Sequence, residues 1–465
     1  MMWILIDKLS DMPLIRQVYE HIRTQILRGE LKTGDRLPSS RELAFDIKVS
    51  RNVVIEAYEQ LIAEGYLESR QGSGTYVAEG TFLEELNYHL ALPSLQAVES
   101  RENPKDVIDF RSGIPDLDLF PRKIWGQLAY RMSLETSHTA FGYGNPEGRL
   151  ELRLALTKYL LRTRGIRCTP EQIVVTSGAT QAFSLIAKLL LKPGDEVVIE
   201  DPVTHEIQTI FTEPGSVLCP VPVDGYGMKT DLIPPDKKPA FIFVTPSHQF
   251  PLGGILPIQR RLQLIKFARA TDCYIVEDDY DSEFRYLGPP ISSLQGLEPE
   301  RVIYVGTFSK ILSPGLRVGY LILPPSLTDR CRNIKWFNDL HSPSLEQLTL
   351  ARFIEEGHLE RHVSKMKKIY RQRRETLINS LTHHFPNQIK ISGHSTGLHF
   401  IVEFTELDFT KELLQKIYEH HVRVYPVELH TICKEDHNNK LILGYGNVSM
   451  ELIEKGILRL RNAMM

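Results

Sequence analysis

Arg301-Val-Ile-Tyr-Val-Gly-Thr-Phe-Ser-Lys-Ile-Leu-Ser-Pro-Gly-Leu-Arg317 is the stretch of sequence that decides the fold. It begins as an apolar run of strand-forming residues, and Lys310 follows the end of that run. An amine in this position can form a Schiff base with an aldehyde, and Ser309 and Arg317 are near enough in sequence to hold a phosphate. Exposed lysines after strands are also common, so the surrounding motifs must decide between the two interpretations.

Short apolar runs alternate with helical stretches from Val107 to the C-terminus. Unbroken apolar runs are typical of strands buried on both faces, and their alternation with helices predicts an α/β fold with a mostly parallel sheet. Ligands of such sheets bind just beyond the strand ends, where the motifs of this chain fall. The predicted strands are Ile173–Thr176, Glu196–Glu200, Ala240–Thr245, Cys273–Glu277, Val302–Val305 and Gly319–Leu323.

A glycine-containing turn follows the first of these strands. Ser177-Gly-Ala-Thr-Gln181 opens a helix, and the free N–H groups of Ala179 and Thr180 at its start can bind a phosphate. Any turn from strand to helix can carry a glycine, so this motif alone leaves both interpretations open.

An acidic segment, Glu277-Asp-Asp-Tyr-Asp-Ser-Glu-Phe284, follows another predicted strand. A carboxylate there can keep a pyridine nitrogen protonated, and the tyrosine can bond a ring oxygen. The same residues can instead form a solvated edge or bind a metal ion. We expect no metal site, because no histidine accompanies the carboxylates at ligand spacing.

The first eighty residues predict three helices and a hairpin. Pro13–Gly29 has apolar residues at helical spacing, Ser39-Ser-Arg-Glu42 is a capping box that begins a second helix, and Ser50 is an N-cap for a third. Tyr66–Val77 then predicts a hairpin that turns at Gly72-Ser-Gly74. Two short helices joined by a tight turn form the helix-turn-helix plan, and the hairpin forms a wing beside them.

DNA contacts are expected at the third helix, because its first residues meet the major groove in this geometry. Arginine there can bond guanine or phosphate, asparagine can bond a base edge or phosphate, and an arginine on the second helix can position the DNA backbone. The alternative is a small helical domain with surface arginines, since residues 13–78 carry nine basic and nine acidic residues. The candidate residues are Arg41, Ser50, Arg51 and Asn52, followed by Arg36, Arg70 and Gln71.

Two family resemblances rest on these motifs. Residues 13–78 resemble a GntR-type winged helix through Leu37–Ala44, Val49–Arg51, Ala57–Leu61, Ala63–Leu67 and Gly72–Val77. From about Phe110 onward the chain resembles the fold-type I, pyridoxal-phosphate-dependent aminotransferases. The segments that carry this second resemblance, in the family's order, are Phe110–Asp116, Leu119–Pro121, Tyr143–Gly148, Leu152-Arg153 and Pro246–Gly253. Together the two halves resemble the MocR/GabR-type transcriptional regulators.

The resemblance implies a role for each motif residue. Lys310 would form the Schiff base with pyridoxal phosphate, and Asp278 would pair with the pyridine nitrogen. We prefer Asp278 to Asp279 because it is the first aspartate after the glutamate of the strand. Tyr280 would bond the phenolic oxygen of the cofactor. The phosphate would be held by Ala179, Thr180, Ser309 and Arg317, and by Tyr143 from the partner subunit of a homodimer.

Several positions depart from the aminotransferase pattern. Phe250 stands where the family has an asparagine that bonds the phenolic oxygen, although phenylalanine is usual in the regulator branch. Thr204 stands where an aromatic residue would stack on the ring, and His205 is the nearest substitute. For the arginine that binds the substrate carboxylate, Arg423 is a candidate, while Gly444-Tyr-Gly446 occupies a stretch where one is expected. We therefore expect cofactor binding without efficient transamination.

The predicted organisation is a winged helix over residues 1–78, a linker over 79–106 and an aminotransferase-like domain over 107–465. The linker includes a helical stretch around Leu83–Leu90, and the large domain ends in a smaller subdomain from about residue 335. Five scattered cysteines and the lack of an apolar run long enough to cross a bilayer predict a cytoplasmic protein.

The predicted function is a transcriptional regulator that binds two DNA half-sites as a homodimer. It would sense pyridoxal phosphate or an amino compound through aldimine formation at Lys310. One alternative is an active pyridoxal-phosphate-dependent aminotransferase with an accessory helix-turn-helix head. Another is a DNA-binding protein whose enzyme-like domain serves only for dimerisation.

Overall fold

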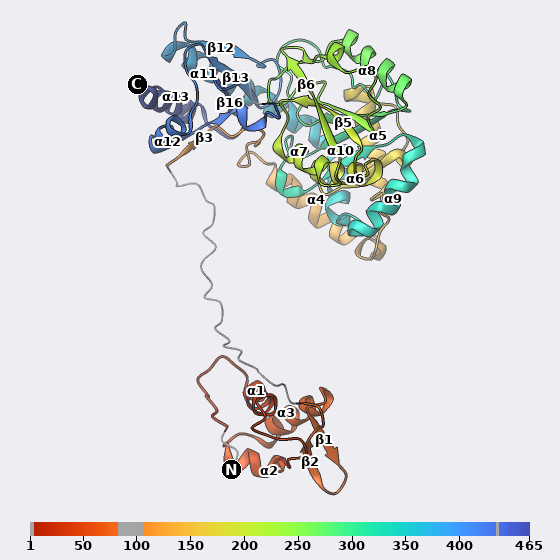
Figure 1. The fold of residues 1–465 in the computed structure, drawn as a ribbon, viewed down its shortest axis with the longest axis vertical. Coiled ribbons are helices and arrows are strands. Elements are labelled where there is room, and N and C mark those ends of the chain that lie inside the picture. Colours follow the sequence, from red (N-terminus) through yellow and green to blue (C-terminus); the bar gives the residue numbers. More distant parts are fainter. Residues whose placement is uncertain (1–3, 82–105, 434–436) are drawn as a thin grey trace. The chain divides into compact units, whose positions relative to one another are not determined.

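The computed structural model describes residues 4–81, 106–433 and 437–465. They belong to two compact units, Met1–Glu102 and Asn103–Met465 (Figure 1). The helix expected around Leu83–Leu90 lies outside the described residues. Across the three described ranges, every helix is either too short or too polar to cross a lipid bilayer.

The N-terminal unit contains the three predicted helices and the predicted hairpin. Its elements are α1 (Leu14–Leu27), α2 (Ser40–Asp46), α3 (Arg51–Ala63), β1 (Leu67–Arg70) and β2 (Gly74–Val77), the last two antiparallel. The capping box is confirmed, because the Ser39 hydroxyl accepts a hydrogen bond from the Glu42 amide and the Glu42 carboxylate accepts one from the Ser39 amide.

The core of this unit lies between α1 and α3. Val18, Ile22, Val54 and Leu61 are fully buried there. Ile62 is on the apolar side of the third helix by periodicity, yet 36% of it is exposed, because the buried face of α3 is centred on Val54, Ala57 and Leu61.

An eight-stranded sheet forms the centre of the C-terminal unit. Strands β10, β9, β8, β5 and β6 run parallel, β11 is antiparallel to both of its neighbours, and β7 is antiparallel to β6. This confirms the predicted, mostly parallel sheet. In spatial order the strands are β4 (Ile173–Thr176), β11 (Gly319–Ile322), β10 (Val302–Thr307), β9 (Tyr274–Asp279), β8 (Phe241–Val244), β5 (Glu196–Asp201), β6 (Val217–Asp224) and β7 (Gly227–Met228).

Helices cover both faces of the large sheet. Alternate residues of β5 show this directly, because Val197 and Ile199 pack with residues of α6 and α7 while Val198 packs with residues of α8. The helices of this layered region are α4 (Arg122–Glu135), α5 (Leu150–Arg164), α6 (Ala179–Leu190), α7 (His205–Thr212), α8 (Ile258–Thr271), α9 (Pro325–Asp339) and α10 (Ser344–Glu355), with 3-10 turns η1 (His138–Phe141), η2 (Pro170–Gln172), η3 (Thr230–Leu232) and η4 (Pro314–Leu316).

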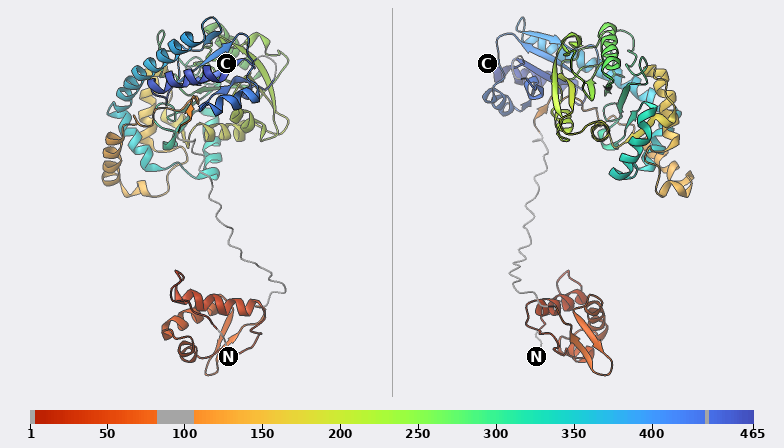
Figure 2. Two further views of the ribbon diagram at one scale, coloured as in Figure 1. Left: turned by 90° about the vertical axis from the view of Figure 1, so that its left-hand side faces the viewer. Right: turned by 45° about the vertical axis from the view of Figure 1, so that its right-hand side comes forward.

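A second, four-stranded sheet forms the smaller subdomain, drawn in blue in Figure 2. We predicted that this subdomain starts at about residue 335. Within that range α9 packs on α6 and α10 packs on α4 and α5, and the first strand of the second sheet begins at Ile389. Its elements are α11 (His358–His384), β12 (Ile389–Ser392), β13 (His399–Phe404), α12 (Lys411–Glu419), β15 (Tyr425–Pro426), η5 (Val427–His430), β16 (Lys440–Gly444) and α13 (Met450–Met464).

The start of the C-terminal unit also reaches this smaller subdomain. β3 (Ile108–Asp109) pairs in parallel with β14 (Val422–Arg423), which joins residues more than three hundred positions apart. The segment that follows β3 lies against Gly444 of β16 at Arg111 and against the side chain of Lys310 at Gly113.

Gly319 and Gly178 are in direct backbone contact, and this contact gives a first prediction. A Cβ atom on Gly319 would lie 2.8 Å from the carbonyl carbon of Gly178. We expect Gly319→Ala to destabilise the C-terminal unit by about 1–3 kcal/mol, because overpacking moves the backbone. Urea unfolding followed by tryptophan fluorescence measures the change.

Gly126→Ala is the matched control, because Gly126 lies inside α4 and an added Cβ would have no neighbour within 4 Å. Alanine there should stabilise the helix by about 0.5–1 kcal/mol. Equal stabilities of the two variants would contradict the tight packing at Gly319.

Candidate functional site

The parallel pairing of β9 and β10 brings the acidic segment and the lysine to one edge of the sheet. Val305 is in register with Asp278, and Lys310 follows the end of β10 at Thr307. β11 is antiparallel to both β10 and β4, so β4 runs in the same direction as β10. The turn at Ser177, which follows β4, therefore lies at the same edge.

Lys310 is held in a crowded, half-buried position. The backbone at Gly113 has φ +70°, which favours glycine, and a Cβ there would lie 2.9 Å from Lys310 Nζ, so the amine lies close against this turn. Burial lowers the pKa of Lys310, the charge of Arg111 lowers it further, and the charges of Asp281 and Asp278 oppose the shift. A lowered pKa increases the fraction of neutral amine, which is the form that attacks an aldehyde.

Asp278 has a buried oxygen atom that lacks a partner. The residue is half-buried as a whole, but its Oδ1 is fully buried and has no hydrogen-bond partner within the described part of the chain. Burial raises the pKa of Asp278 well above its usual range, and the neighbouring Asp279 and Asp281 raise it further. A buried acceptor without a donor is costly, so this carboxyl group fits a ligand that brings a protonated ring nitrogen.

Asp279 is bonded elsewhere through its Oδ2 atom, which separates it from Asp278. Its Oδ2 lies 2.6 Å from the guanidinium of Arg164 on α5, and it also accepts a hydrogen bond from the Tyr304 hydroxyl. The geometry therefore supports the choice of Asp278 over Asp279 as the partner of a pyridine nitrogen.

The turn between β4 and α6 offers free amides and a guanidinium. Gly178 is the N-cap of α6 with φ +92°, and Ala179 and Thr180 are the first two helical residues, whose amides have no acceptor inside the helix. The Arg317 guanidinium donates to the Ser177 carbonyl at 2.7 Å. A Cβ on Gly178 would lie 2.9 Å from that guanidinium, so Arg317 covers the turn.

Ser309 is the last of the predicted phosphate ligands within the single chain, and it immediately precedes Lys310. Its hydroxyl lies 3.1 Å from the Thr307 hydroxyl, and its amide donates to the same Thr307 oxygen. An amine, an unpartnered carboxyl oxygen and a turn with free amides beside a guanidinium fit the aldehyde, ring nitrogen and phosphate of pyridoxal phosphate.

The Tyr280 hydroxyl is engaged with His248. It donates to the His248 carbonyl oxygen at 2.9 Å, and the two rings stack with centroids 5.8 Å apart. A hydroxyl has one hydrogen, so donation from Tyr280 to a ligand oxygen requires that this bond be given up.

A buried cluster around His248 was not foreseen from the sequence. His248 Nδ1 lies 2.9 Å from Asp281 Oδ1, and the His399 ring lies 4.8 Å from the His248 ring. One possible ligand atom from each of the three residues lies within 4.8 Å of the other two. We predicted no metal site from sequence spacing, and spacing carries no signal for a cluster drawn from three distant segments.

The positions that depart from the aminotransferase pattern have structural roles. Phe250 contacts Tyr280, His399 and His430 edge to face, with centroids 6.3, 5.2 and 5.1 Å away. The Thr204 hydroxyl accepts a hydrogen bond from the Ile207 amide and so caps α7. His205, which we considered as a substitute for the ring-stacking residue, is the first residue of α7 and is exposed.

The two arginine candidates lie in different surroundings. Arg423, on β14, places its guanidinium 5.6 Å from the centre of the Tyr425 ring. Arg111, which we did not single out from the sequence, follows β3 and acts electrostatically on Lys310. Arg111 is placed near the lysine by the pairing of β3 with β14, which joins segments at the two ends of the C-terminal unit. Local sequence carries no signal for this pairing.

Tyr143 is not covered within the single chain. Its side chain is 83% exposed, and its ring meets His341 edge on at 6.4 Å. An aromatic side chain so exposed is free to contact a second subunit.

The candidate DNA-binding residues are exposed but differ in their local contacts. Ser50 occupies the N-cap of α3 without a side-chain cap bond, and Arg51 donates to the Ser40 hydroxyl at 3.3 Å. Arg70 is paired with Glu68 and stacks on Tyr76, so its guanidinium is already engaged within the hairpin. Exposed positions are also occupied by Arg36, Arg41, Asn52 and Gln71, and Arg36 lies over Gly74 of the hairpin.

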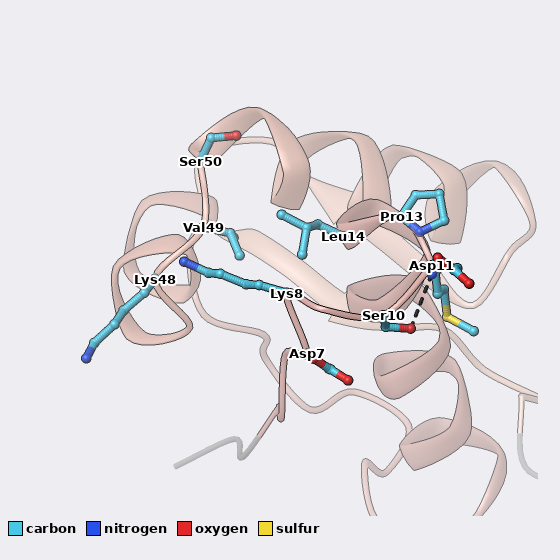
Figure 3. A pocket seen from close by; sticks show the side chains of 10 residues that line it. Asp7, Lys8, Ser10, Asp11, Pro13, Leu14, Lys48, Val49 and Ser50 are labelled. Carbon is cyan, nitrogen blue, oxygen red and sulfur yellow. Dashed lines mark hydrogen bonds between the residues drawn. The ribbon is translucent and has the colours of Figure 1, made fainter.

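A hollow beside the start of α3 is lined by Lys8 and Lys48, which we did not single out from the sequence. Figure 3 shows it lined by residues 7, 8 and 10–14 and by Lys48, Val49 and Ser50, with the Lys8 side chain extending toward Val49. Gln17 holds the first of these segments, because it accepts from the Asp7 amide and donates to the Asp7 and Met12 carbonyls. The segment has no periodic pattern, so its sequence gave no signal.

These features define a class of protein: a winged helix-turn-helix unit joined to an α/β unit of the fold-type I, pyridoxal-phosphate-binding kind. Residues 14–77 match the bacterial regulatory proteins of the gntR family, and residues 105–454 match aminotransferase class I and II. The chain belongs to the MocR-type family of transcriptional regulators, in which these two domains are combined, and this confirms the resemblance inferred from the sequence.

Two curated relatives and one solved structure illustrate the match. The probable rhizopine catabolism regulatory protein MocR of Rhizobium meliloti is 35% identical over 99% of this chain and 96% of its own. The pyridoxine biosynthesis transcriptional regulator PdxR of Corynebacterium glutamicum is 34% identical over 83% of this chain and 82% of its own. Kynurenine aminotransferase of Pyrococcus horikoshii, solved with PMP, matches 80% of this chain and 96% of its own at 29% identity, with a TM-score of 0.72.

The charge of Arg111 gives a prediction for pH dependence. Arg111 lowers the pKa of Lys310, so Arg111→Ala should raise that pKa. The lysine is reactive above its pKa and protonated below it. The rate of pyridoxal phosphate uptake rises with pH around that pKa, and in the variant the midpoint of this rise should lie at a higher pH than in the wild type. Stopped-flow absorbance across a pH series measures the midpoint.

The exposed Arg330 on α9 provides the control, as Arg330→Ala. An unchanged midpoint in Arg111→Ala, or an equal shift in both variants, would show that Arg111 does not act on the lysine.

Proposed function

We propose that this chain is a transcriptional regulator that binds DNA through its winged helix and pyridoxal phosphate through Lys310. It senses the cofactor itself or an amino compound that reacts with it. The observation that carries the proposal is the unpartnered, buried Oδ1 of Asp278 at the sheet edge where Lys310 emerges. When bound, pyridoxal phosphate supplies an aldehyde that exchanges amines reversibly.

Each residue of the pocket has a task in this proposal. Lys310, with its lowered pKa, presents a neutral amine. Asp278 would accept a hydrogen bond from the protonated pyridine nitrogen, and Tyr280 would bond the phenolic oxygen after giving up its bond to the His248 carbonyl. The phosphate ligands are Ala179, Thr180, Ser309 and Arg317, which are grouped around the start of α6 and the end of β10.

Two lines of support favour a regulator over an enzyme. Phe250 and Thr204 replace side chains that aminotransferases use on the cofactor, and here they pack on neighbouring rings or cap α7. Relatives that match nearly the whole chain or more than four-fifths of it carry the names of transcriptional regulators, one of them of pyridoxine biosynthesis.

We propose a cytoplasmic homodimer that binds two DNA half-sites. Tyr143 is the residue that would pass from one subunit to the phosphate of the other, and its exposure in the single chain supports this arrangement. Two winged helices, one from each subunit, would then meet two half-sites.

Lys310→Ala tests the cofactor site directly. The wild-type protein should gain a visible absorption band on titration with pyridoxal phosphate, and borohydride should then fix the cofactor to Lys310. The variant should retain neither the band nor the covalent label, because it lacks the amine. A peptide map of the reduced protein identifies the labelled residue, and a label on another lysine would sink the proposed site.

The same preparation separates sensing from catalysis. A panel of amino acids and amines is added to the loaded protein while the band and the keto product are followed. A shift of the band with one compound and no steady keto product supports a sensor. Sustained keto product that disappears in Lys310→Ala would instead establish the alternative, an aminotransferase with an accessory DNA-binding head.

The DNA-binding face has its own prediction. With DNA selected by the protein from a random-sequence pool, Arg51→Ala should weaken binding by about 1–3 kcal/mol and relax the sequence preference. Arg41→Ala should weaken binding to all sequences and reduce the salt slope by about one, because it loses a phosphate contact. Fluorescence anisotropy over a range of salt concentrations measures both effects.

Lys32→Ala is the control for these arginines, since Lys32 is exposed in the segment after α1, away from the start of α3 in sequence. Unchanged affinity in Arg41→Ala and Arg51→Ala would rule out this face as the DNA contact.

A further inference from the structure

A chain of hydrogen bonds connects α9 to the turn at the start of α6, outside the residues assigned above. Lys335 on α9 has a fully buried side chain, and its Nζ donates to both carboxylate oxygens of Asp339 at 2.7 and 2.9 Å. Asp339 Oδ2 also accepts from the Gln181 side-chain amide at 2.7 Å. Gln181 Oε1 in turn accepts from the backbone N–H of Ser177 at 2.7 Å.

Both polar groups of the Ser177 backbone are therefore held by side chains. Gln181 holds its N–H, and Arg317 donates to its carbonyl oxygen at 2.7 Å. Gly178 follows at once and turns the chain with φ +92°. The direction of the next two amides, those of Ala179 and Thr180, depends on how this turn is held.

Gln181 holds the turn without using the amides that a phosphate needs. It is the third residue of α6, a position from which a side chain commonly bonds back to an amide before the helix. Here it takes the Ser177 amide, which precedes the N-cap, and the Ala179 and Thr180 amides stay available. The side chain thus sets the shape of the turn and leaves its anion-binding groups open.

The buried lysine explains why Asp339 is a firm anchor. Burial lowers the pKa of Lys335, while its hydrogen bond with the Asp339 carboxylate raises it. A carboxylate gripped through both oxygens by a buried ammonium has one orientation, and bonds to a charged acceptor are stronger than neutral ones. The Gln181 amide accordingly points one way, and so does its carbonyl oxygen.

We propose that Gln181, Asp339 and Lys335 are positioning residues that orient the turn for the phosphate group of the cofactor. This inference rests on the proposed binding of pyridoxal phosphate at Lys310. None of the three residues needs to touch the cofactor, because they act through the Ser177 backbone and leave the amides of Ala179 and Thr180 free.

Comparison of pyridoxal phosphate with pyridoxal tests this role. Pyridoxal has the same ring and aldehyde but no phosphate, so a residue that acts only on the phosphate turn affects one ligand and spares the other. In the full chain, Gln181→Ala should raise the Kd of pyridoxal phosphate roughly tenfold to a hundredfold, as expected for a lost charge-linked hydrogen bond. The Kd of pyridoxal should stay within about twofold.

Lys188→Ala is the matched control. Lys188 on α6 donates to the Asn338 side chain on α9 at 2.8 Å, so it joins the same two helices on the exposed side without reaching the turn. Its removal should leave both dissociation constants unchanged. Asp339→Asn, which keeps the size of the side chain and removes its charge, serves as the second variant should Gln181→Ala fail to fold, and thermal unfolding checks each protein.

The outcomes separate this inference from the function on which it rests. Selective loss of pyridoxal phosphate in Gln181→Ala or Asp339→Asn supports the positioning role. Equal weakening of both ligands, or unchanged binding of pyridoxal phosphate in a folded variant, overturns it. Wild-type protein that binds neither ligand overturns the proposed function itself, and that result appears before any substitution is made.

Discussion

The parallel hydrogen-bond register of β9 with β10 is the constraint on which the pocket depends. It sets Val305 opposite Asp278, so the strand that leads to Lys310 ends beside the strand that carries the carboxyl group. β11 then returns antiparallel and brings β4 into the same direction, which adds the turn at Ser177 to that edge. A shift of one residue between β9 and β10 would turn Asp278 to the other face of the sheet.

Burial then supplies the chemistry of these side chains. It lowers the pKa of Lys310 and raises that of Asp278, so both groups are displaced toward their neutral forms. A ligand with an aldehyde, a protonated ring nitrogen and a phosphate would satisfy the amine, the unpartnered carboxyl oxygen and the free amides together. These displaced groups lie at one sheet edge, as is typical of a functional site.

Much of this arrangement could be predicted from local sequence. β4 has the predicted bounds, Ile173–Thr176, because three consecutive apolar residues and a threonine, all buried, form a strand covered on both faces. The capping box at Ser39 formed as predicted, since its two hydrogen bonds involve neighbours only three residues apart. The choice between Asp278 and Asp279 rested on order alone, and its structural support is the ion pair of Asp279 with Arg164 on a distant helix.

What sequence could not reveal depends on contacts between distant segments. The helical pattern of α9 and α10 does not say which sheet these helices cover, and their packing on α6, α4 and α5 shows it. Arg111 is near enough to lower the pKa of Lys310 because β3 pairs with β14, and Asp339 bonds Gln181 because α9 packs on α6. Such long-range pairings leave no trace in periodicity or spacing.

The protein can act as a sensor only if ligand binding in the pocket changes the affinity of the winged helix for DNA. A ligand shifts an equilibrium only when it binds the two states with different affinity. The most direct test is the affinity of the wild-type protein for its selected DNA, measured by anisotropy with and without pyridoxal phosphate, beside Lys310→Ala. We predict different affinities for the cofactor-free and cofactor-loaded wild type, and one unchanged affinity for the variant. Equal affinity in every form would contradict a sensor that acts through Lys310.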